Sequence, residues 1–404
     1  MEIYTYLDIN NDPTLIGTLF VDNTNGNELY AFEYDNNWLN TNNKFLLDPN
    51  IDYYVGRQYN ENKRLFGFIM DSCPDRWGRL LLNRNENLLA KKENRRPKKL
   101  LESDYLLGIN DFTRMGALRF KKDLNGDFLS KDEKLIPPLA SVRELEDASY
   151  KLEDEDNLQI EKNLQQLLMP GSSLGGARPK ANVIDLDNNL WIAKFPSKND
   201  DYDVGAFEKV SYDLAKLCKI NVSESMIEKY NTKGSTFLCK RFDRNKKDRI
   251  HFASAMTLLA KSDGEQASYL DLVSFVVSNC KNVKKNLEQL FRRLVFNIAI
   301  SNYDDHLRNH GFILNNGEWE LSPMYDINPV YYNDHLSLNI DMLNNNADFD
   351  LALDTCKYYK LTNDEAKEII NEIKTIVKDN WFNLCKKYSI SNKDIDLMKT
   401  AFVK

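Results

Sequence analysis

The hydrophobic pattern at the beginning of the chain is that of β-strands joined by tight turns. Two runs rich in β-branched and aromatic residues cover residues 15–21 and 28–34, and such residues favour strands. The polar run Asp22–Asn27 between them has the composition of a turn. A helical pattern follows within residues 60–92, around Pro74–Leu82. This part of the chain therefore predicts strands and turns followed by a helix.

The middle of the chain alternates between helical and strand patterns. A turn-rich loop over residues 170–179 opens a β-hairpin, whose own turn is Asp187-Asn188-Asn189. Val210, Leu214 and Leu217 share one side of the helix that comes next. We expect helices over residues 141–152, 157–168 and 203–219, and strands over residues 181–186, 190–195 and 236–241.

After about residue 250 the pattern is mainly helical. Apolar residues at i, i+3, i+4, i+7, i+8 and i+11 form one stripe of an amphipathic helix, and they are Leu287, Leu290, Phe291, Leu294, Val295 and Ile298. Thr362-x-x-Glu365 has the pattern of a capping box before another apolar stripe. The order of elements predicts an α+β protein, in which a crevice between a β-rich lobe and a helical lobe would suit a nucleotide.

Composition and charge narrow the class of protein. Hydrophobic residues make up 42% of the chain and aromatic residues 11%, which indicates folded domains rather than disorder. The formal net charge is -7 and the isoelectric point is about 5.4, so the chain as a whole is not expected to coat nucleic acid. A solvated loop explains the basic run Lys91–Lys99 more simply than a phosphate contact does.

The cysteines and the N-terminus favour a cytoplasmic protein. Six cysteines are scattered without a C-x-x-C pair, so neither a zinc ribbon nor a redox motif is expected, and reduced thiols fit a cytosol. Met1–Tyr6 has neither the basic region nor the apolar region of a signal peptide. No apolar run approaches the roughly 20 residues that a membrane span requires.

The strongest chemical signal is the stretch 302–309, followed by Asp326. Asp304 and Asn309 have the D-x-x-x-x-N spacing of the catalytic loop of protein kinases. In phosphoryl transfer one carboxylate orients a hydroxyl nucleophile, while an amide and a second carboxylate hold magnesium against the phosphates. Asp304 would be the first carboxylate, and Asn309 and Asp326 would be the metal ligands. Asp305 is an alternative base, and an ordinary turn rich in Asp and Asn explains these residues without chemistry.

A glycine-rich loop and two lysines are candidates for binding phosphates. The glycines of the loop 171–180 would let backbone N–H groups approach phosphate oxygens, although the G-K-[ST] of a Walker A motif is missing and a flexible linker is the alternative. Lys180 ends this loop, and Lys194 lies in an apolar strand, where burying its charge without a partner is costly. Glu208 on the next helix could pair with Lys194. A lysine at a sheet edge is the simpler explanation.

Two further segments could support such a site. Phe242 and Asp243 follow the last predicted strand, where the backbone and an aromatic ring could meet adenine and a carboxylate could meet ribose. A strand-end turn explains them equally well. His306 could support the 304–309 loop by hydrogen bonding or bind a phosphate as a cation. With His310 it has i, i+4 spacing but lacks the H-E-x-x-H pattern, so a metal role is not expected.

In this order the segments resemble the HipA family, the serine/threonine kinase toxins of bacterial type II toxin–antitoxin systems. Other pieces that resemble family patterns are Pro74–Gly78, Arg114–Phe120, Arg241–Arg244 and Leu321–Asp326. The resemblance spans nearly the whole chain and implies a bilobal protein-kinase-like fold with an extra N-terminal β subdomain and a mainly helical C-lobe. The implied domains are an N-terminal subdomain over 1–120, a kinase N-lobe with the Gly/Ser-rich loop over 121–245, and a helical C-lobe over 246–404.

The resemblance also implies cofactors and residue roles. ATP and Mg2+ would be the cofactors, Asp304 the catalytic base, and Asn309 and Asp326 the magnesium ligands. The implied contacts to ATP are Lys180 and Lys194 for the phosphates and Phe242 and Asp243 for the adenosine.

Regulation is implied by the Gly/Ser-rich loop. Ser173 matches the serine that the family autophosphorylates, and in the family phosphorylation ejects this loop from the ATP site and inactivates the enzyme. Repulsion between the added phosphate and the nucleotide makes this reasonable. Ser172 doubles the hydroxyl, and Arg178-Pro179 replaces a frequent Gln-Glu pair, so these departures concern regulation and substrate more than catalysis.

The implied partners are proteins. A helix-turn-helix antitoxin (HipB-like) would hold the kinase and bind operator DNA, so that contact with DNA would be indirect, and no membrane would be involved. The phosphorylated target would be a translation component such as an aminoacyl-tRNA synthetase. Two alternatives remain at this stage, a small-molecule kinase on the same scaffold and an inactive kinase-like corepressor.

Overall fold

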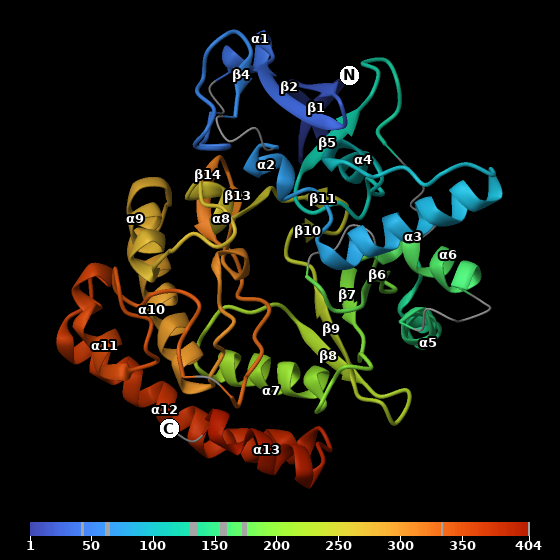
Figure 1. Cartoon of the computed structure of the whole chain (residues 1–404). Coiled ribbons are helices and arrows are strands. Elements are labelled where there is room, and N and C mark those ends of the chain that lie inside the picture. Colours follow the sequence, from blue (N-terminus) through green and yellow to red (C-terminus); the bar gives the residue numbers. More distant parts are fainter. Residues whose placement is uncertain are drawn as a thin grey trace. The chain divides into compact units, whose positions relative to one another are not determined.

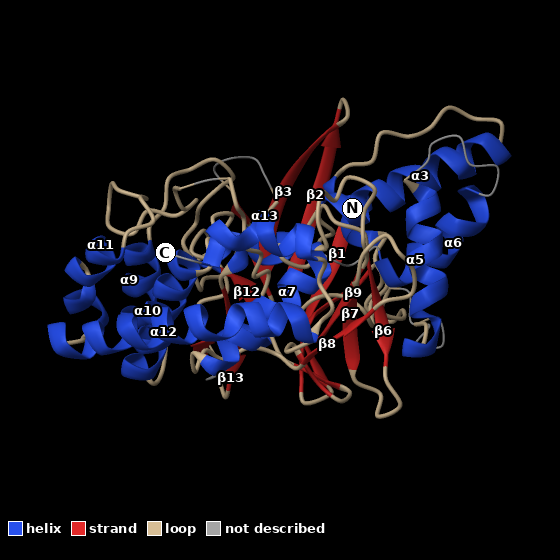
Figure 2. Ribbon diagram, turned by 90° about the horizontal axis from the view of Figure 1, so that it is seen from below, coloured by secondary structure: helices blue, strands red, loops and turns tan. Residues whose placement is uncertain are grey.

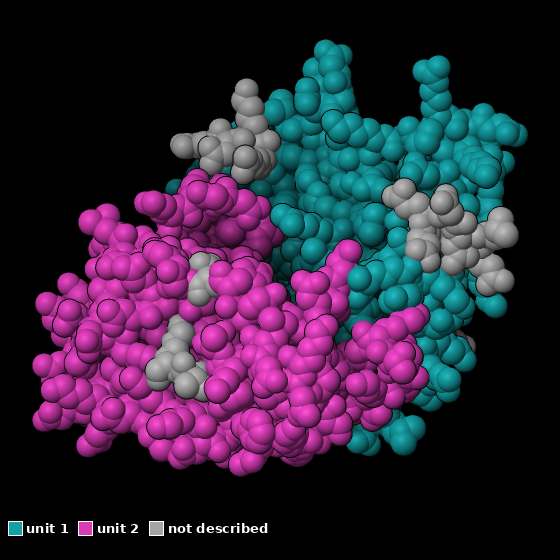
Figure 3. Space-filling view, turned by 60° about the horizontal axis from the view of Figure 1, so that its bottom comes forward, with its two compact units in different colours: residues 1–198, 240–253 teal, residues 199–239, 254–404 magenta. Residues whose placement is uncertain are grey.

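The computed structural model of the chain describes residues 1–41, 44–60, 65–129, 136–153, 160–171, 176–332 and 334–402 (Figures 1 and 2). Contacts divide the chain into two compact units, coloured separately in Figure 3. The first unit comprises residues 1–198 and 240–253, and the second comprises residues 199–239 and 254–404. Each unit combines two stretches of the chain, and the division into three consecutive domains remains a prediction.

A five-stranded antiparallel sheet forms the beginning of the first unit, in the order β4-β3-β2-β1-β5. Its strands are β1 (Glu2–Ile9), β2 (Asp12–Thr24), β3 (Asn27–Tyr34), β4 (Gln58–Tyr59) and β5 (Leu118–Lys121). Asn25 and Gly26 between β2 and β3 have positive φ values of 55° and 79°, as a two-residue type I′ turn requires. Ile3, Leu19 and Phe32 stand opposite one another on three strands and are each 0% exposed. The two strands expected here are confirmed.

Helices and 3-10 turns make up much of the rest of the first unit. They are α1 (Asn36–Leu39), α2 (Gly67–Met70), α3 (Arg76–Lys92), α4 (Glu102–Leu107), η2 (Leu139–Ser141), α5 (Val142–Leu152) and α6 (Ile160–Gly171). Helix α6 packs against α3 and α5 and continues through Pro170, where the sequence predicts a loop. Asn182 Nδ2 donates to the Pro170 carbonyl oxygen at 2.8 Å, which satisfies one of the acceptors left at the helix end.

Two hairpins complete the first unit. Strands β6 (Lys180–Ile184) and β7 (Leu190–Lys194) pair antiparallel, as predicted. A shorter pair consists of β10 (Arg244–Asn245) and β11 (Asp248–Arg249). The Arg241 N–H donates to the Leu190 carbonyl oxygen at 2.9 Å, so the segment before β10 runs beside the start of β7.

The second unit is richer in helices. They are α7 (Val204–Leu217), α8 (Ala255–Leu258), α9 (Tyr269–Asn279), α10 (Val283–Ala299), α11 (Phe349–Asp354), α12 (Asn363–Lys387) and α13 (Asn392–Phe402), with the 3-10 turns η3 (Leu307–Asn309) and η4 (Cys356–Tyr359). Strand β8 (Ser225–Glu228) pairs with β9 (Thr236–Lys240), and β13 (Gly311–Asn315) pairs with β14 (Glu318–Leu321). Strand β12 (Phe252–Ser254) leads the chain back into this unit. Within the described ranges, every helix is too short or too polar to cross a membrane.

Helix α10 lies at the centre of the helical part of the second unit. In Figure 2, α9, α11 and α12 gather around it, and α10 packs against all three. The six residues of the predicted apolar stripe are each 0% exposed. The expected capping box of α12 is present, since the Glu365 side chain accepts from the Thr362 N–H at 2.8 Å. A helix buried in this way gives a fixed starting point to the loop that follows it.

Candidate active site

The loop after α10 is held in a closed turn. Its first residue with an unusual backbone is Ser301, whose φ is 56°. Asn309 Nδ2 donates to the Asp304 carbonyl oxygen at 2.9 Å, and the Asn309 N–H donates to the His306 carbonyl oxygen at 2.8 Å. Because the Asn309 amide nitrogen is used in this way, its Oδ1 is the atom that remains for a cation. These bonds bring the two ends of the predicted D-x-x-x-x-N motif together.

Burial distinguishes the two neighbouring aspartates. Asp304 is exposed, whereas Asp305 is 2% exposed and accepts hydrogen bonds from His310 Nε2 at 2.8 Å and from the Tyr269 hydroxyl. Burial alone would raise the pKa of Asp305, but His310 and Tyr269 hold it below its usual value. Only an exposed carboxylate can meet a substrate hydroxyl, so the geometry favours Asp304 over Asp305 as the base.

A second loop of the same unit presents Asp326. The Met324 N–H donates to the Asn221 carbonyl oxygen at 2.8 Å, and the Tyr325 hydroxyl donates to the Arg308 carbonyl oxygen at 2.7 Å. Since Tyr325 precedes Asp326 and Arg308 precedes Asn309, this bond links the two loops that carry the predicted metal ligands. Asp326 has a φ of 55°, and such a backbone costs about 1–3 kcal/mol and concentrates at functional sites.

The donor atoms of Asn309 and Asp326 fit a magnesium ion. Among the described residues no group of three or more His, Cys, Asp or Glu is placed to hold a metal. An amide oxygen and a carboxylate are hard ligands, and Mg2+ is usually bound through one or two such groups, with water and phosphate oxygens completing its shell. The pair therefore suits a metal that arrives with a nucleotide.

Glu208 and His306 are the two supporting residues expected in the second unit. Glu208 lies on α7 and is 1% exposed. Burial raises the pKa of Tyr212 well above its usual value, and the charges of Cys239, Glu208 and Asp326 raise it further, so Glu208 and Asp326 both lie near this tyrosine. His306 supports the loop through its carbonyl oxygen, while a role for its ring stays a prediction.

The first unit contains the predicted phosphate contacts. Lys180 and Lys194 stand directly opposite each other on β6 and β7 and are 5% and 9% exposed. Two lysines directly opposite each other on a hairpin concentrate positive charge at one place. Such a concentration is suited to a polyanion such as a triphosphate. The expected pairing of Lys194 with Glu208 stays a prediction.

The N-terminus of α3 binds Gly176, in the glycine-rich segment, and holds it next to Lys180. The Gly176 N–H donates to the Asp75 carboxylate at 2.9 Å, and the Trp77 N–H donates to the Gly176 carbonyl oxygen at 3.0 Å. Gly176 has a φ of +84°, which residues with a Cβ rarely adopt, so the backbone favours glycine there. A Cβ at this position would lie 2.6 Å from Lys180 Nζ, so the lysine ammonium group is directly beside Gly176. Trp77 Nε1 also donates to the Lys180 carbonyl oxygen at 2.9 Å. The sequence gives no local sign of these roles for Asp75 and Trp77, apart from their place in a family-like segment.

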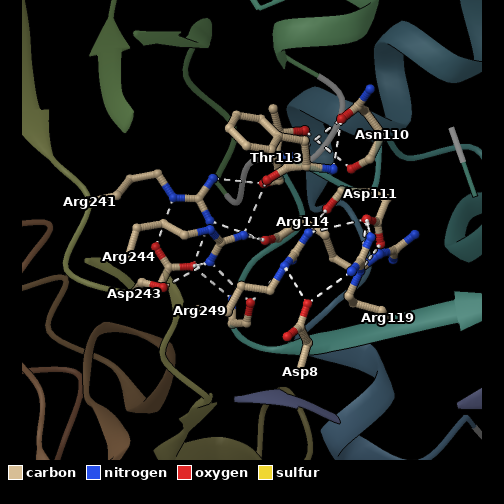
Figure 4. A network of polar contacts seen from close by, with 12 residues as sticks. Asp8, Asn110, Asp111, Thr113, Arg114, Arg119, Arg241, Asp243, Arg244 and Arg249 are labelled. Atoms are coloured by element: carbon tan, nitrogen blue, oxygen red, sulfur yellow. Dashed lines mark hydrogen bonds and ion pairs between the residues drawn. The ribbon is translucent and has the colours of Figure 1, made fainter. Parts of the chain in front are cut away.

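Asp243 lies in a buried network of charges (Figure 4). It is 1% exposed and accepts from Arg241 at 2.6 and 2.8 Å, from Arg244 at 2.7 Å and from the Gly116 N–H at 2.7 Å. Although burial alone would raise the pKa of Asp243, the two arginines hold it far below its usual value. This network gives Asp243 an architectural role, and its contact with ribose stays a prediction.

Phe242 and the two serines complete the set of predicted residues. Phe242 is half-buried, and its ring lies 5.8 Å from that of Phe252, measured between centroids. Its contact with adenine is untested. Ser172 and Ser173, the expected autophosphorylation sites, lie outside the described residues.

Comparison with known proteins identifies the family. Residues 172–381, just over half of the chain, match the model of the HipA-like C-terminal domain. A relative from Haemophilus influenzae, described as a "Putative kinase", is 27% identical over 182 residues, which are 39% of this chain and 52% of that protein. The chain thus matches about half the length of this curated relative.

Solved structures give the fold. A chain of the Shewanella oneidensis MR-1 toxin–antitoxin complex of HipA, HipB and operator DNA superimposes with a TM-score of 0.69 at 17% identity, over 99% of this chain and 95% of that one. The Helicobacter pylori proinflammatory kinase CtkA gives a TM-score of 0.38 at 16% identity, over 55% of this chain and 92% of its own. The first match shows the expected α+β, kinase-like fold with its N-terminal β-sheet. The chain therefore belongs to the family of the HipA-like C-terminal domain.

Proposed function

We propose that the chain is an ATP- and Mg2+-dependent serine/threonine protein kinase and the toxin of a type II toxin–antitoxin system. The loop 304–309 is the observation that carries this proposal. Asp304 provides an exposed carboxylate in this loop. Asn309 Nδ2 donates to the Asp304 carbonyl oxygen at 2.9 Å, while Asn309 Oδ1 accepts no hydrogen bond from the described residues. Membership of the family supports the class of reaction.

In this proposal each group of the second unit has one task. Asp304 orients the acceptor hydroxyl and takes its proton as the bond from the hydroxyl oxygen to the γ-phosphorus of ATP forms. The bond from that phosphorus to the bridging oxygen breaks, and ADP leaves with that oxygen. Asn309 Oδ1 and the Asp326 carboxylate hold Mg2+, which when bound neutralises the charge on the phosphate oxygens. The strained backbone of Asp326, with its φ of 55°, fits a residue kept for binding rather than for stability.

The first unit supplies the contacts to the nucleotide. Lys180 and Lys194 neutralise the phosphates, and their opposite positions in the hairpin support this role. Phe242 packs against adenine. Asp243 fixes the segment that carries Phe242, because its carboxylate is bound to Arg241 and Arg244.

Autophosphorylation at Ser173 or Ser172 would act through charge. Gly176 follows these serines and lies against the Lys180 ammonium group. A phosphate added a few residues earlier would compete with the nucleotide for this cation. The modification would therefore lower the affinity for ATP.

The partners in this proposal are a helix-turn-helix antitoxin and a protein acceptor. The complex of HipA with HipB and operator DNA from Shewanella oneidensis supports the first. The acceptor is a translation component such as an aminoacyl-tRNA synthetase, and DNA is contacted through the antitoxin.

The test uses the full chain with Mg2+ and γ-labelled ATP, beside the Asp304→Ala variant. We expect label on Ser172 or Ser173 of the wild type, mapped by mass spectrometry, and a loss of transfer of about 10²–10⁴-fold in the variant. Nucleotide binding should survive, because Asp304 contacts the acceptor rather than ATP. Equal turnover of the two proteins would refute the assignment. Label found only on metabolites would indicate a small-molecule kinase.

A further inference from the structure

Five buried polar side chains in and around the loop 304–309 are joined by a continuous row of hydrogen bonds, which we call the polar chain. They are His310, Asp305, Tyr269, Asn297 and Asn302, and each is at most 2% exposed. Tyr269 begins α9 and Asn297 lies in the last turn of α10, two helices that pack against each other (Figures 1 and 2). The proposed mechanism uses none of the five.

One end of this polar chain is the Asp305 carboxylate. It accepts from His310 Nε2 at 2.8 Å and from the Tyr269 hydroxyl. The Tyr269 oxygen in turn accepts from Asn297 Nδ2 at 2.9 Å. The His310 ring also meets the Tyr269 ring edge to face, with centroids 5.4 Å apart. The carboxylate is therefore fixed from two directions.

The other end is a backbone N–H. Asn297 Oδ1 accepts from Asn302 Nδ2 at 2.9 Å, and Asn302 Oδ1 accepts from the N–H of Asn328 at 3.2 Å. A carboxylate can only accept and a backbone N–H can only donate. The two ends therefore determine the orientation of each amide and of the hydroxyl between them. Bonds aligned in one direction in a buried site polarise and strengthen one another.

The residues at the ends of the polar chain are close neighbours in sequence of the proposed active residues. Asp305 follows Asp304, His310 follows Asn309, and Asn328 lies two positions after Asp326. We propose that these buried side chains are positioning residues, which fix the spacing of the base and the two metal ligands before substrate binds. This inference rests on the proposed function. The five side chains contact neither substrate nor metal themselves, and they act by holding Asp304, Asn309 and Asp326 in place.

A matched pair of tyrosine variants tests the proposal. Tyr269→Phe removes one hydroxyl from the polar chain. Tyr359→Phe removes a hydroxyl from an equally buried tyrosine, and this hydroxyl has no hydrogen-bond partner in the described part of the chain. We expect Tyr269→Phe to lower kcat by about 10- to 100-fold and to raise the Mg2+ concentration needed for half-maximal turnover. Tyr359→Phe should change neither quantity.

A purely structural role would give a different result. Tyr269→Phe would then lower Tm but leave kcat and the Mg2+ requirement unchanged well below that temperature, and this outcome would overturn the proposal. Two variants of similar shape at Asp305 add a second check. Asp305→Asn keeps an oxygen that can accept from His310 and Tyr269, so it should retain most of the activity. Asp305→Leu removes this acceptor, and its kcat should fall at least as far as that of Tyr269→Phe. Equal activity of these two variants would also contradict the proposal.

Amide hydrogen exchange separates this inference from the proposed function. If the wild type transfers no phosphate, the proposed kinase activity fails, but the polar chain still predicts faster exchange of the amides in 301–312 in Tyr269→Phe. Exchange in α12 should stay unchanged. Identical exchange of the loop in the wild type and the variant would refute the positioning role whether or not the enzyme is active.

Discussion

At the scale of single residues, neighbours in sequence have different environments. Asp304 is exposed while Asp305 is buried, although the sequence offers both as the base. Asp305 is bound by Tyr269 of α9 as well as by the nearby His310, so a local pattern alone does not indicate its burial. The opposition of Lys180 and Lys194 is only partly local. The predicted turn at Asp187–Asn189 would place Asn182 opposite Lys194, whereas in the structure the loop is longer and Lys180 is opposite Lys194.

The facing lysines lead to a prediction about binding and stability together. In Lys194→Met we expect the affinity for ATP to fall about 10-fold or more, because a hydrogen bond to a charged group contributes about 1.5–3 kcal/mol. ATP should also raise the unfolding temperature of the wild type more than that of Lys194→Met, because a ligand that binds more tightly stabilises the folded state more. Calorimetric titration and thermal unfolding measure the two effects.

The control for this prediction is Lys162→Met, which removes an exposed lysine of α6. It should alter neither nucleotide binding nor the unfolding temperature by a comparable amount. An unchanged affinity in Lys194→Met would show that this lysine does not contact the phosphates.

At the scale of elements, the sequence predicts those features of helices and strands that depend only on residues close together in the chain. The stripe of α10 and the capping box at Thr362 are confirmed because helical periodicity and capping depend on residues close in sequence. The continuation of α6 through Pro170 depends on Asn182 of β6, a contact that no window around the proline contains. The anchoring of Gly176 and Lys180 on α3 is likewise tertiary, since it joins them to Asp75 and Trp77, about 100 positions away.

The contact between α3 and Lys180 can be tested by removing the indole N–H of Trp77. Trp77→Phe removes the donor that binds the Lys180 carbonyl oxygen at 2.9 Å, and an unsatisfied buried acceptor costs about 1–3 kcal/mol. We expect this loss of stability together with a several-fold rise in KM for ATP, because Gly176 and Lys180 are no longer held together. Trp38→Phe is the matched control, since the buried Trp38 Nε1 has no partner in the described ranges. Equal KM values for the two variants would contradict a role of the anchor in nucleotide binding.

At the scale of the whole molecule, buried charges connect segments that are remote in sequence. In the first unit Arg119 binds Asp8 at 2.9 Å and Asp111 at 2.6 Å, and Arg249 binds Asp111 at 3.2 Å. Figure 4 shows this cluster together with the contacts of Asp243. It ties the N-terminal sheet to the segment after β9. The sequence shows these residues only as ordinary charges, because ion pairs over such separations leave no periodic pattern.

The Asp243 contacts predict how stability depends on pH. The pKa of Asp243 is depressed in the folded chain by Arg241 and Arg244, despite burial, so the carboxylate stabilises the fold fully above the unfolded value of about 3.9. This contribution is lost as the pH falls below that value towards the folded pKa. Asp243→Asn leaves buried arginines without their counter-charge, so we expect a loss of about 3–5 kcal/mol at pH 7.

Denaturant unfolding of the wild type and Asp243→Asn between pH 7 and pH 2 measures this dependence. The difference in unfolding free energy should stay constant down to about pH 4 and shrink below it, because only the wild type loses an interaction there. Asp187→Asn, which changes an exposed turn aspartate of the same unit, is the control and should lose far less stability than Asp243→Asn at pH 7. A difference that grows on acidification would mean that Asp243 is protonated in the folded chain. The arginines around it would then need another source of negative charge.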